Sequence, residues 1–138
     1  MKIVKRLGIF IGAVVLLLVA AAIILKKPGH LERRSEGKLL ATALLSSLET
    51  YQTKHNKYPT MPELQTVMAE QKIALKYYTF GTAESSPDVA KVCSDCHLKD
   101  DSFKIAIYGN IDEDPNLDVI GISDREKNPF IILSDIDD

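Results

Sequence analysis

The sequence has no tryptophan, no internal repeat and no low-complexity tract, and it contains two cysteines. It also lacks a Gly-rich phosphate-binding loop, a nucleophile elbow and a metalloprotease motif, and its few Ser and His residues form no recognisable triad. Hydrolytic catalysis therefore has no support in the sequence, and we expect a protein that is not an enzyme. The remaining composition is ordinary for a globular protein, which predicts one domain with one modest core.

Positive charge is scarce in most of the chain. Residues 35–138 contain ten Lys and Arg residues against eighteen Asp and Glu residues, whereas residues 1–34 contain seven Lys and Arg residues and one acidic residue. The excess of negative charge disfavours a nucleic acid as partner, because nucleic acids are polyanions. The basic residues near the N-terminus instead suit the anionic headgroups of lipids.

Charge is absent altogether from Leu7 to Leu25, a run of nineteen residues. A helix of that length spans roughly the hydrocarbon thickness of a bilayer. We therefore predict a membrane anchor with basic flanks at residues 1–30, with the lipid bilayer as its partner. The alternative is a cleaved signal peptide, since Ala20-Ala21-Ala22 resembles a cleavage site. Basic residues on the two flanks balance, so charge does not decide which side of the membrane the remaining chain occupies.

The next part of the chain has the periodicity of two helices. From Leu40 to Leu48 a leucine recurs at every fourth position, which predicts an amphipathic helix from about Leu31 to His55. The segment Thr60-Met61-Pro62-Glu63 then has the pattern of a capping box with proline in the first turn. It predicts a shorter helix that ends near Lys72.

After these helices the pattern changes to strands rich in β-branched and aromatic residues. The predicted strands are Lys76 to Phe80, Phe103 to Tyr108, Asp118 to Ile122 and Phe130 to Leu133. The last three are close enough in sequence to form a meander, and a long loop from Gly81 to Ser102 carries both cysteines. The predicted fold class is α+β, with an N-terminal transmembrane helix that continues into an amphipathic helix packed on a small antiparallel sheet.

This order of elements, with the segments Arg34-Ser-Glu-Gly-Lys-Leu-Leu40 and Asn56-Lys-Tyr-Pro-Thr60, resembles a type IV pilin or pseudopilin. The segment from Phe103 to Val119, FKIAIYGNIDEDPNLDV, is similar to a strand-loop-strand motif of pilins from predatory and related bacteria. The resemblance implies a pilin-like domain at residues 31–138. It also implies a structural or interaction role in a type IV pilus or type II secretion-like assembly, with other pilin-like subunits as partners.

The resemblance further implies a single-pass protein of the bacterial inner membrane, with its domain in the periplasm or outside the cell. One departure from the family bears on assembly. Cleavage after Gly8 would make Ile9 the new N-terminus, but the fifth residue of that mature chain is Ala13, where pilins carry a glutamate. This implies either a minor or initiating subunit, or a pilin-derived domain on an uncleaved anchor.

The segment Cys93-Ser-Asp-Cys96-His97 matches the C-x-x-C-H pattern of c-type haem attachment. In that chemistry the two thiols form thioethers to the haem and the histidine ligates the iron. The function would then be single-electron transfer by a membrane-anchored monohaem cytochrome domain. The candidates for the sixth iron ligand are His55, His30, Met61 and Met68.

The same cysteines have two other interpretations. Cys93 and Cys96 fit a disulfide that pins the loop, or plain thiols, with His97 as a surface neighbour. A metal other than haem iron is the third interpretation, although four ligands for structural zinc are not evident.

Polar residues alternate through the loop after the second predicted strand. Asn110 precedes the four residues that we select as calcium ligands, which are Asp112, Asp114, Asn116 and Asp118. This spacing can turn several oxygens toward a hard cation. Asp and Asn are also common turn formers between strands, so the alternative is an ordinary turn.

Overall fold

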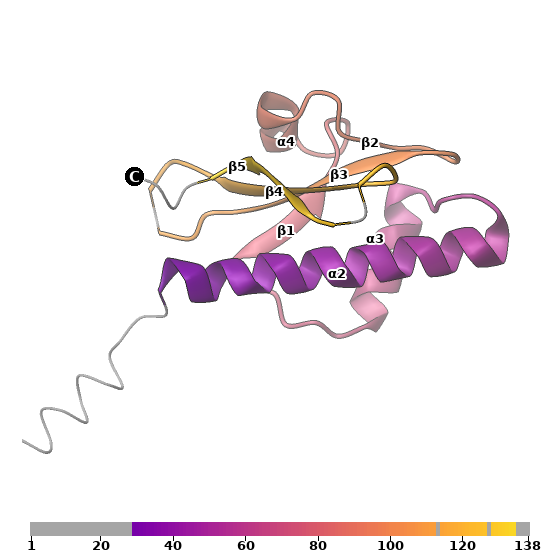
Figure 1. Cartoon of the computed structure of the whole chain (residues 1–138), viewed down its shortest axis with the longest axis horizontal. Coiled ribbons are helices and arrows are strands. Elements are labelled where there is room, and N and C mark those ends of the chain that lie inside the picture. The colour runs from indigo at the N-terminus through magenta and orange to yellow at the C-terminus, as the bar shows by residue number, and fades with distance from the viewer. Residues whose placement is uncertain (1–28, 113, 127, 135–138) are drawn as a thin grey trace, which may run out of the picture.

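The computed structural model describes residues 29–112, 114–126 and 128–134. A long helix lies along one face of a five-stranded antiparallel sheet, which is an α+β arrangement (Figure 1). The elements in chain order are α2 (His30–His55), α3 (Met61–Glu70), β1 (Tyr78–Gly81), α4 (Pro87–Val92), β2 (His97–Leu98), β3 (Phe103–Gly109), β4 (Asp118–Ser123) and β5 (Phe130–Leu133).

The prediction of a transmembrane helix is corrected by the described part of the chain. Among the described residues, no helix combines the length and the apolar surface needed to cross a membrane. The longest helix, α2, begins at His30 and exposes charged residues such as Lys38 and Glu49 between its buried leucines. Of the anchor or signal peptide predicted at residues 1–30, only Gly29 and His30 are among the described residues. The predicted cleavage at Gly8 lies outside them.

Helix α2 has about the bounds that its sequence predicts, because local capping signals mark its start and its end. At its start, the backbone N–H of Gly29 donates to Oε2 of Glu32 at 3.2 Å. At its end, Asn56 adopts a left-handed conformation with φ 56°, and its N–H donates to the carbonyl oxygen of Gln52. Helix α3 stops two residues earlier than predicted, before Lys72, which has φ 52°.

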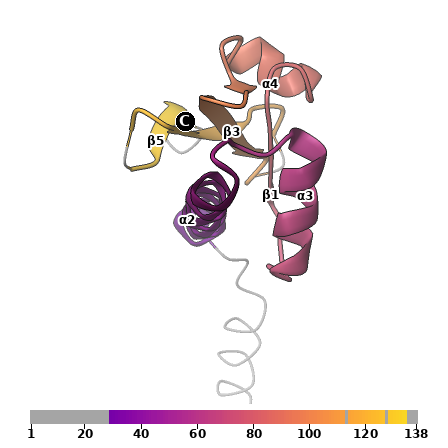
Figure 2. The same cartoon turned by 90° about the vertical axis from the view of Figure 1, so that its right-hand side faces the viewer.

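The sheet has the strand order β1-β3-β4-β5, and the short β2 pairs with β3 beside β1. The predicted meander of the last three strands is confirmed, with Ile107 opposite Ile120 between β3 and β4. Figure 2 shows α2 and α3 on one side of the sheet and α4 on the other. The core beneath α2 includes these buried residues from the helices and from the sheet: Leu40, Leu44, Leu48, Leu64, Ile105, Ile107, Ile120 and Ile122.

Helix α2 approaches the sheet closely at Gly37. A methyl group added there would lie 2.8 Å from the Tyr78 ring and 3.0 Å from Cδ1 of Ile120. Glycine at this position therefore allows the start of the helix to rest directly on the sheet.

Two short elements were not predicted. Helix α4 and strand β2 both lie in the segment that we expected to be a long loop, Gly81 to Ser102. Ser86 caps α4 by accepting a hydrogen bond from the backbone N–H of Val89, and Pro87 occupies the first turn. The sequence analysis placed this segment in a loop, because a helix of six residues is too short to show a helical period.

Candidate functional site

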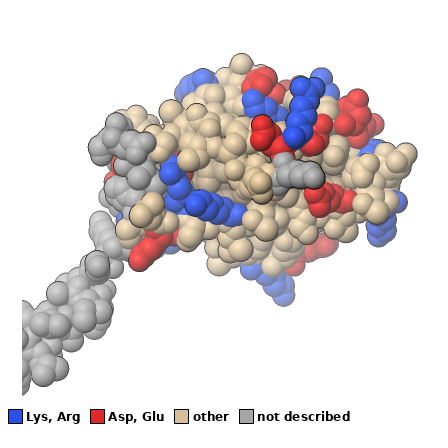
Figure 3. Space-filling model, in the orientation of Figure 1, with Lys and Arg blue, Asp and Glu red and all other residues tan. Residues whose placement is uncertain are grey.

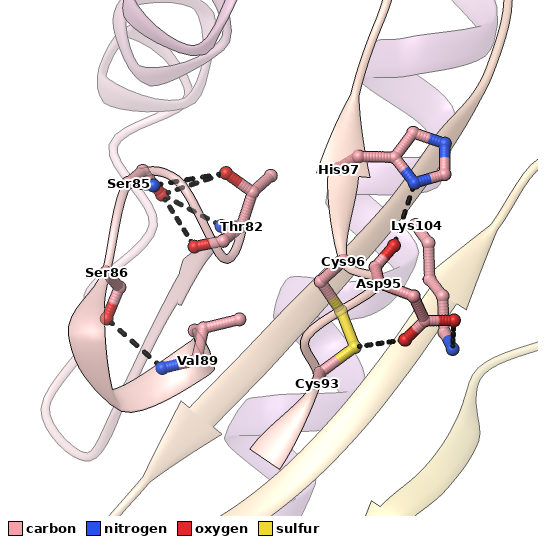
Figure 4. Close-up of a disulfide and its surroundings, with 9 residues drawn as sticks. All are labelled: Thr82, Ser85, Ser86, Val89, Cys93, Asp95, Cys96, His97 and Lys104. Carbon is pink, nitrogen blue, oxygen red and sulfur yellow. Dashed lines mark hydrogen bonds and ion pairs between the residues drawn. A yellow bond between two sulfur atoms is a disulfide. The ribbon is translucent and has the colours of Figure 1, made fainter. Parts of the chain in front are cut away.

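A disulfide joins the end of α4 to the start of β2. Cys93 and Cys96 are bonded to each other and are 4% and 2% exposed (Figure 4). They pack in a second cluster of buried residues, on the face of the sheet opposite α2, with Val89, Ala106 and Val119. The carbonyl oxygen of Cys96 also accepts a hydrogen bond from the N–H of Ala83 at 3.0 Å. The disulfide therefore ties α4 and the preceding turn onto the sheet.

This geometry corresponds to the disulfide interpretation of the two cysteines. The residues as they lie here do not fit a c-type haem, because the two sulfur atoms that would form thioethers are bonded to each other and buried. Met68 packs in the core beneath α2, where its sulfur accepts a hydrogen bond from Ser47, and His55 packs against Tyr51. No observation brings these predicted iron ligands toward His97, and haem attachment stays a prediction.

His97 makes two hydrogen bonds with its imidazole ring. Its Nδ1 lies 2.8 Å from the carbonyl oxygen of Asp95, and its Nε2 lies 3.2 Å from Oγ of Ser102. A carbonyl oxygen can only accept a hydrogen bond, so Nδ1 carries the proton and Nε2 of the neutral ring is an acceptor. The sequence analysis did not find this contact, because it depends on the β2–β3 hairpin that brings residues 97 and 102 together.

Lys104 of β3 holds the loop that contains Asp95. Its Nζ lies 2.6 Å from Oδ2 of Asp95 (Figure 4). The hydrogen bond from Lys104 and its positive charge lower the pKa of the Asp95 carboxyl group. The carboxylate is mostly exposed, so this ion pair orients the loop more than it stabilises the fold.

A surface hollow of about 410 Å³ adjoins His97. It lies between the β2–β3 hairpin and the turn that joins β4 to β5. Its lining combines aromatic, hydroxyl and charged side chains of both signs: Asp95, His97, Ser102, Phe103, Lys104, Ser123, Asp124, Arg125, Glu126 and Phe130.

The residues selected as calcium ligands do not share one site. Asp118 is fully buried, with its carboxylate bonded to Arg34 and Tyr78. In the loop, the Asp112 and Asp114 carboxylates instead accept hydrogen bonds from backbone N–H groups two residues later, as in ordinary Asx turns. Across the described residues, no three His, Cys, Asp or Glu side chains are grouped to hold a metal ion. Calcium binding at this loop stays a prediction.

Arg34, Tyr78 and Asp118 form a buried cluster that the sequence analysis missed. Nε of Arg34 donates to Oδ2 of Asp118 at 3.0 Å, Nη2 of Arg34 donates to Oδ1, and the Tyr78 hydroxyl donates to Oδ2 at 2.6 Å. The hydrogen bond with Asp118 raises the pKa of Arg34. Burial and then the hydrogen bond to Asp118 raise the pKa of Tyr78. The sequence analysis counted Arg34 among the basic residues near the N-terminus that suit lipid headgroups.

Glu36 connects the same part of α2 to the entry of β1. Its Oε1 accepts hydrogen bonds from the backbone N–H groups of Lys76, Tyr77 and Tyr78, at 2.9, 2.8 and 3.0 Å. Strand β1 begins at Tyr78, two residues later than predicted, and this carboxylate holds the backbone that leads into it.

The outer face of α2 carries exposed apolar residues. Leu31 is 74% exposed and Leu39 is 59% exposed, in contrast to the leucines of the inner face. Ile131 and Leu133 of the edge strand β5 are exposed as well. On the face shown in Figure 3, acidic and basic side chains are intermixed with uncharged surface between them. The start of α2 therefore presents two exposed leucines among polar and charged neighbours.

Comparison with known proteins finds no match among family models, curated proteins or solved structures. The resemblance to pilins and the haem motif thus stay predictions.

Proposed function

We propose that this chain is a pilin-like structural and interaction protein, a subunit of a type IV pilus or type II secretion-like assembly. The observation that carries the proposal is the exposure of Leu31 and Leu39 on a long helix whose inner face is already packed on a sheet. The inner face of this helix is fixed on the sheet, and two leucines stand exposed among polar and charged residues on its outer surface, where a neighbouring subunit can pack against them.

The start of α2 is also bonded to the sheet by polar side chains. Arg34 bonds Asp118 of β4 and Glu36 bonds the entry of β1. Both residues lie between Leu31 and Leu39 in the sequence, so the exposed leucines are presented on a rigid support. A rigid surface loses little conformational entropy when a partner binds.

The disulfide is informative about the cellular compartment of the protein. Disulfides persist in oxidising environments such as the periplasm and the cell exterior, and they are rare in the cytosol. The bonded pair Cys93 and Cys96 therefore supports the extracytoplasmic location that the proposal requires.

Photo-crosslinking in the native host tests the proposal. The full chain would carry a photoreactive residue at position 39, and a control chain would carry it at position 53, where Thr53 is exposed at the other end of α2. We expect adducts with other subunits of the assembly from position 39, and loss of pilus formation or secretion in the L39D variant. Equal crosslinking from both positions, together with normal assembly of L39D, would overturn the proposal.

A further inference from the structure

The contact between Ser102 and His97 is the strongest chemical feature that the proposed function does not use. Nε2 of the neutral imidazole is an acceptor, since Nδ1 donates its proton to the Asp95 carbonyl oxygen. The Ser102 hydroxyl lies 3.2 Å from Nε2 of His97 and also 3.2 Å from Oδ1 of Asp101, and its rotation lets it donate to either acceptor. A hydroxyl, a base within hydrogen-bond reach and a third group that orients the base are the parts of an activated nucleophile.

The backbone amide of Phe103, the residue after Ser102, supplies a further part of such a nucleophile site. The backbone N–H of Phe103 donates to Oδ1 of Asp124 at 3.3 Å, so it already holds an anionic oxygen. In many hydrolases the N–H of the residue after the nucleophile stabilises the oxyanion of the tetrahedral intermediate. Asp124 is an exposed side chain, so we expect its carboxylate to give way to a substrate oxygen at this amide.

These groups border the hollow of about 410 Å³ described above. That volume lies in the range of small-molecule sites. Phe130 offers an apolar surface for an acyl chain, and the charged side chains of the lining are of both signs, with Lys104 and Arg125 beside Asp95, Asp124 and Glu126. His97 and Ser102 are both half-buried, so a ligand in the hollow can reach them.

We propose that Ser102 and His97 form a nucleophile–base pair that hydrolyses small carboxylic esters bound in this hollow. Oγ of Ser102 forms a bond to the ester carbonyl carbon while Nε2 of His97 takes the hydroxyl proton. The bond between that carbon and the alkoxy oxygen breaks, and the alcohol leaves with the proton from Nε2. Water then attacks the acyl-serine and gives a proton to Nε2, and Oγ recovers that proton as the carboxylic acid leaves.

The test is hydrolysis of p-nitrophenyl acetate by the purified full chain, with the variants S102A and H97Q, their double variant, and S94A as a matched control on the same loop. General-base catalysis contributes about 10²–10⁴-fold, so we expect each single substitution to lower kcat/KM at least about 10²-fold. The double variant is expected to be no slower than S102A, because the two residues act as one unit. S94A is expected to retain the wild-type rate.

A labelling experiment identifies the reacting atom. A fluorophosphonate probe is expected to modify Ser102 of the wild-type chain, as located by peptide mass spectrometry, and to leave S102A and H97Q unmodified. Unchanged melting temperatures and an intact disulfide in the variants show that each is folded. A wild-type rate in folded S102A, hydrolysis no faster than in buffer, or a probe adduct on another residue would overturn the proposal.

Discussion

Arg34, near the start of α2, and Asp118, the first residue of β4, form a buried ion pair across 84 residues of sequence. The Asp118 side chain is fully buried and also accepts a hydrogen bond from Tyr78. A buried carboxylate needs such partners, because an unpaired charge in the protein interior is costly. The pair fixes the helix to the sheet at one defined position.

Removing one member of this pair should be strongly destabilising. We expect R34A to lower the free energy of unfolding by about 3–5 kcal/mol, because it leaves the Asp118 carboxylate buried without its cation. The matched control is K91A, which breaks the exposed pair between Lys91 and Asp88 and should cost less than about 1 kcal/mol. Urea unfolding of the two variants measures both values.

The double variant R34M/D118L separates the contribution of charge to stability from the contribution of packing. It should be more stable than R34A, since it removes both charges and leaves apolar side chains of similar volume. An R34A variant as stable as K91A would show that solvent reaches the pair and that its burial contributes little.

Tyr78 should make the protein sensitive to alkali. Its pKa is raised in the folded state, so its contribution to stability is complete below the ordinary tyrosine value of 10.0 and is lost as pH rises above it. Above pH 10 the unfolding free energy should fall with a slope about 1.4 kcal/mol per pH unit steeper than in Y78F. Identical pH profiles for the two proteins would contradict this assignment.

Glu36 should hold the entry of β1 in place. E36A leaves the backbone N–H groups of Lys76, Tyr77 and Tyr78 without their acceptor, and we expect a loss of about 1–3 kcal/mol. The control E49A removes an exposed carboxylate from the same helix and should have little effect. Hydrogen exchange should speed up at residues 76–78 in E36A alone, and uniform exchange in both variants would disagree with this role.

The state of the cysteines can be read from the intact mass. The purified chain should be lighter than the reduced sequence by two hydrogens, and a host that matures c-type cytochromes should add no haem mass and no α-band. Because the loop is short, reduction should cost roughly 2 kcal/mol of stability. H97A should leave the disulfide intact, whereas a haem-bearing product would restore electron transfer as the function.

The sequence predicts those features that depend on neighbouring residues. The leucine period from Leu40 to Leu48 defines α2, and β-branched runs define β3 to β5. Contacts between distant segments leave no such local signal. The sequence analysis therefore assigned Arg34 to a lipid surface and did not predict its ion pair with Asp118. The pairing of Cys93 with Cys96 was left open, because the same five residues also match a haem motif.

Arg34 and Glu36, two side chains that bond α2 to the sheet and to the entry of β1, lie in the first turns of the helix. Tension applied at the N-terminal end of α2 therefore enters β4 and the start of β1 before it reaches the leucine contacts further along. The load would shear an ion pair and three hydrogen bonds together instead of peeling the helix away one turn at a time.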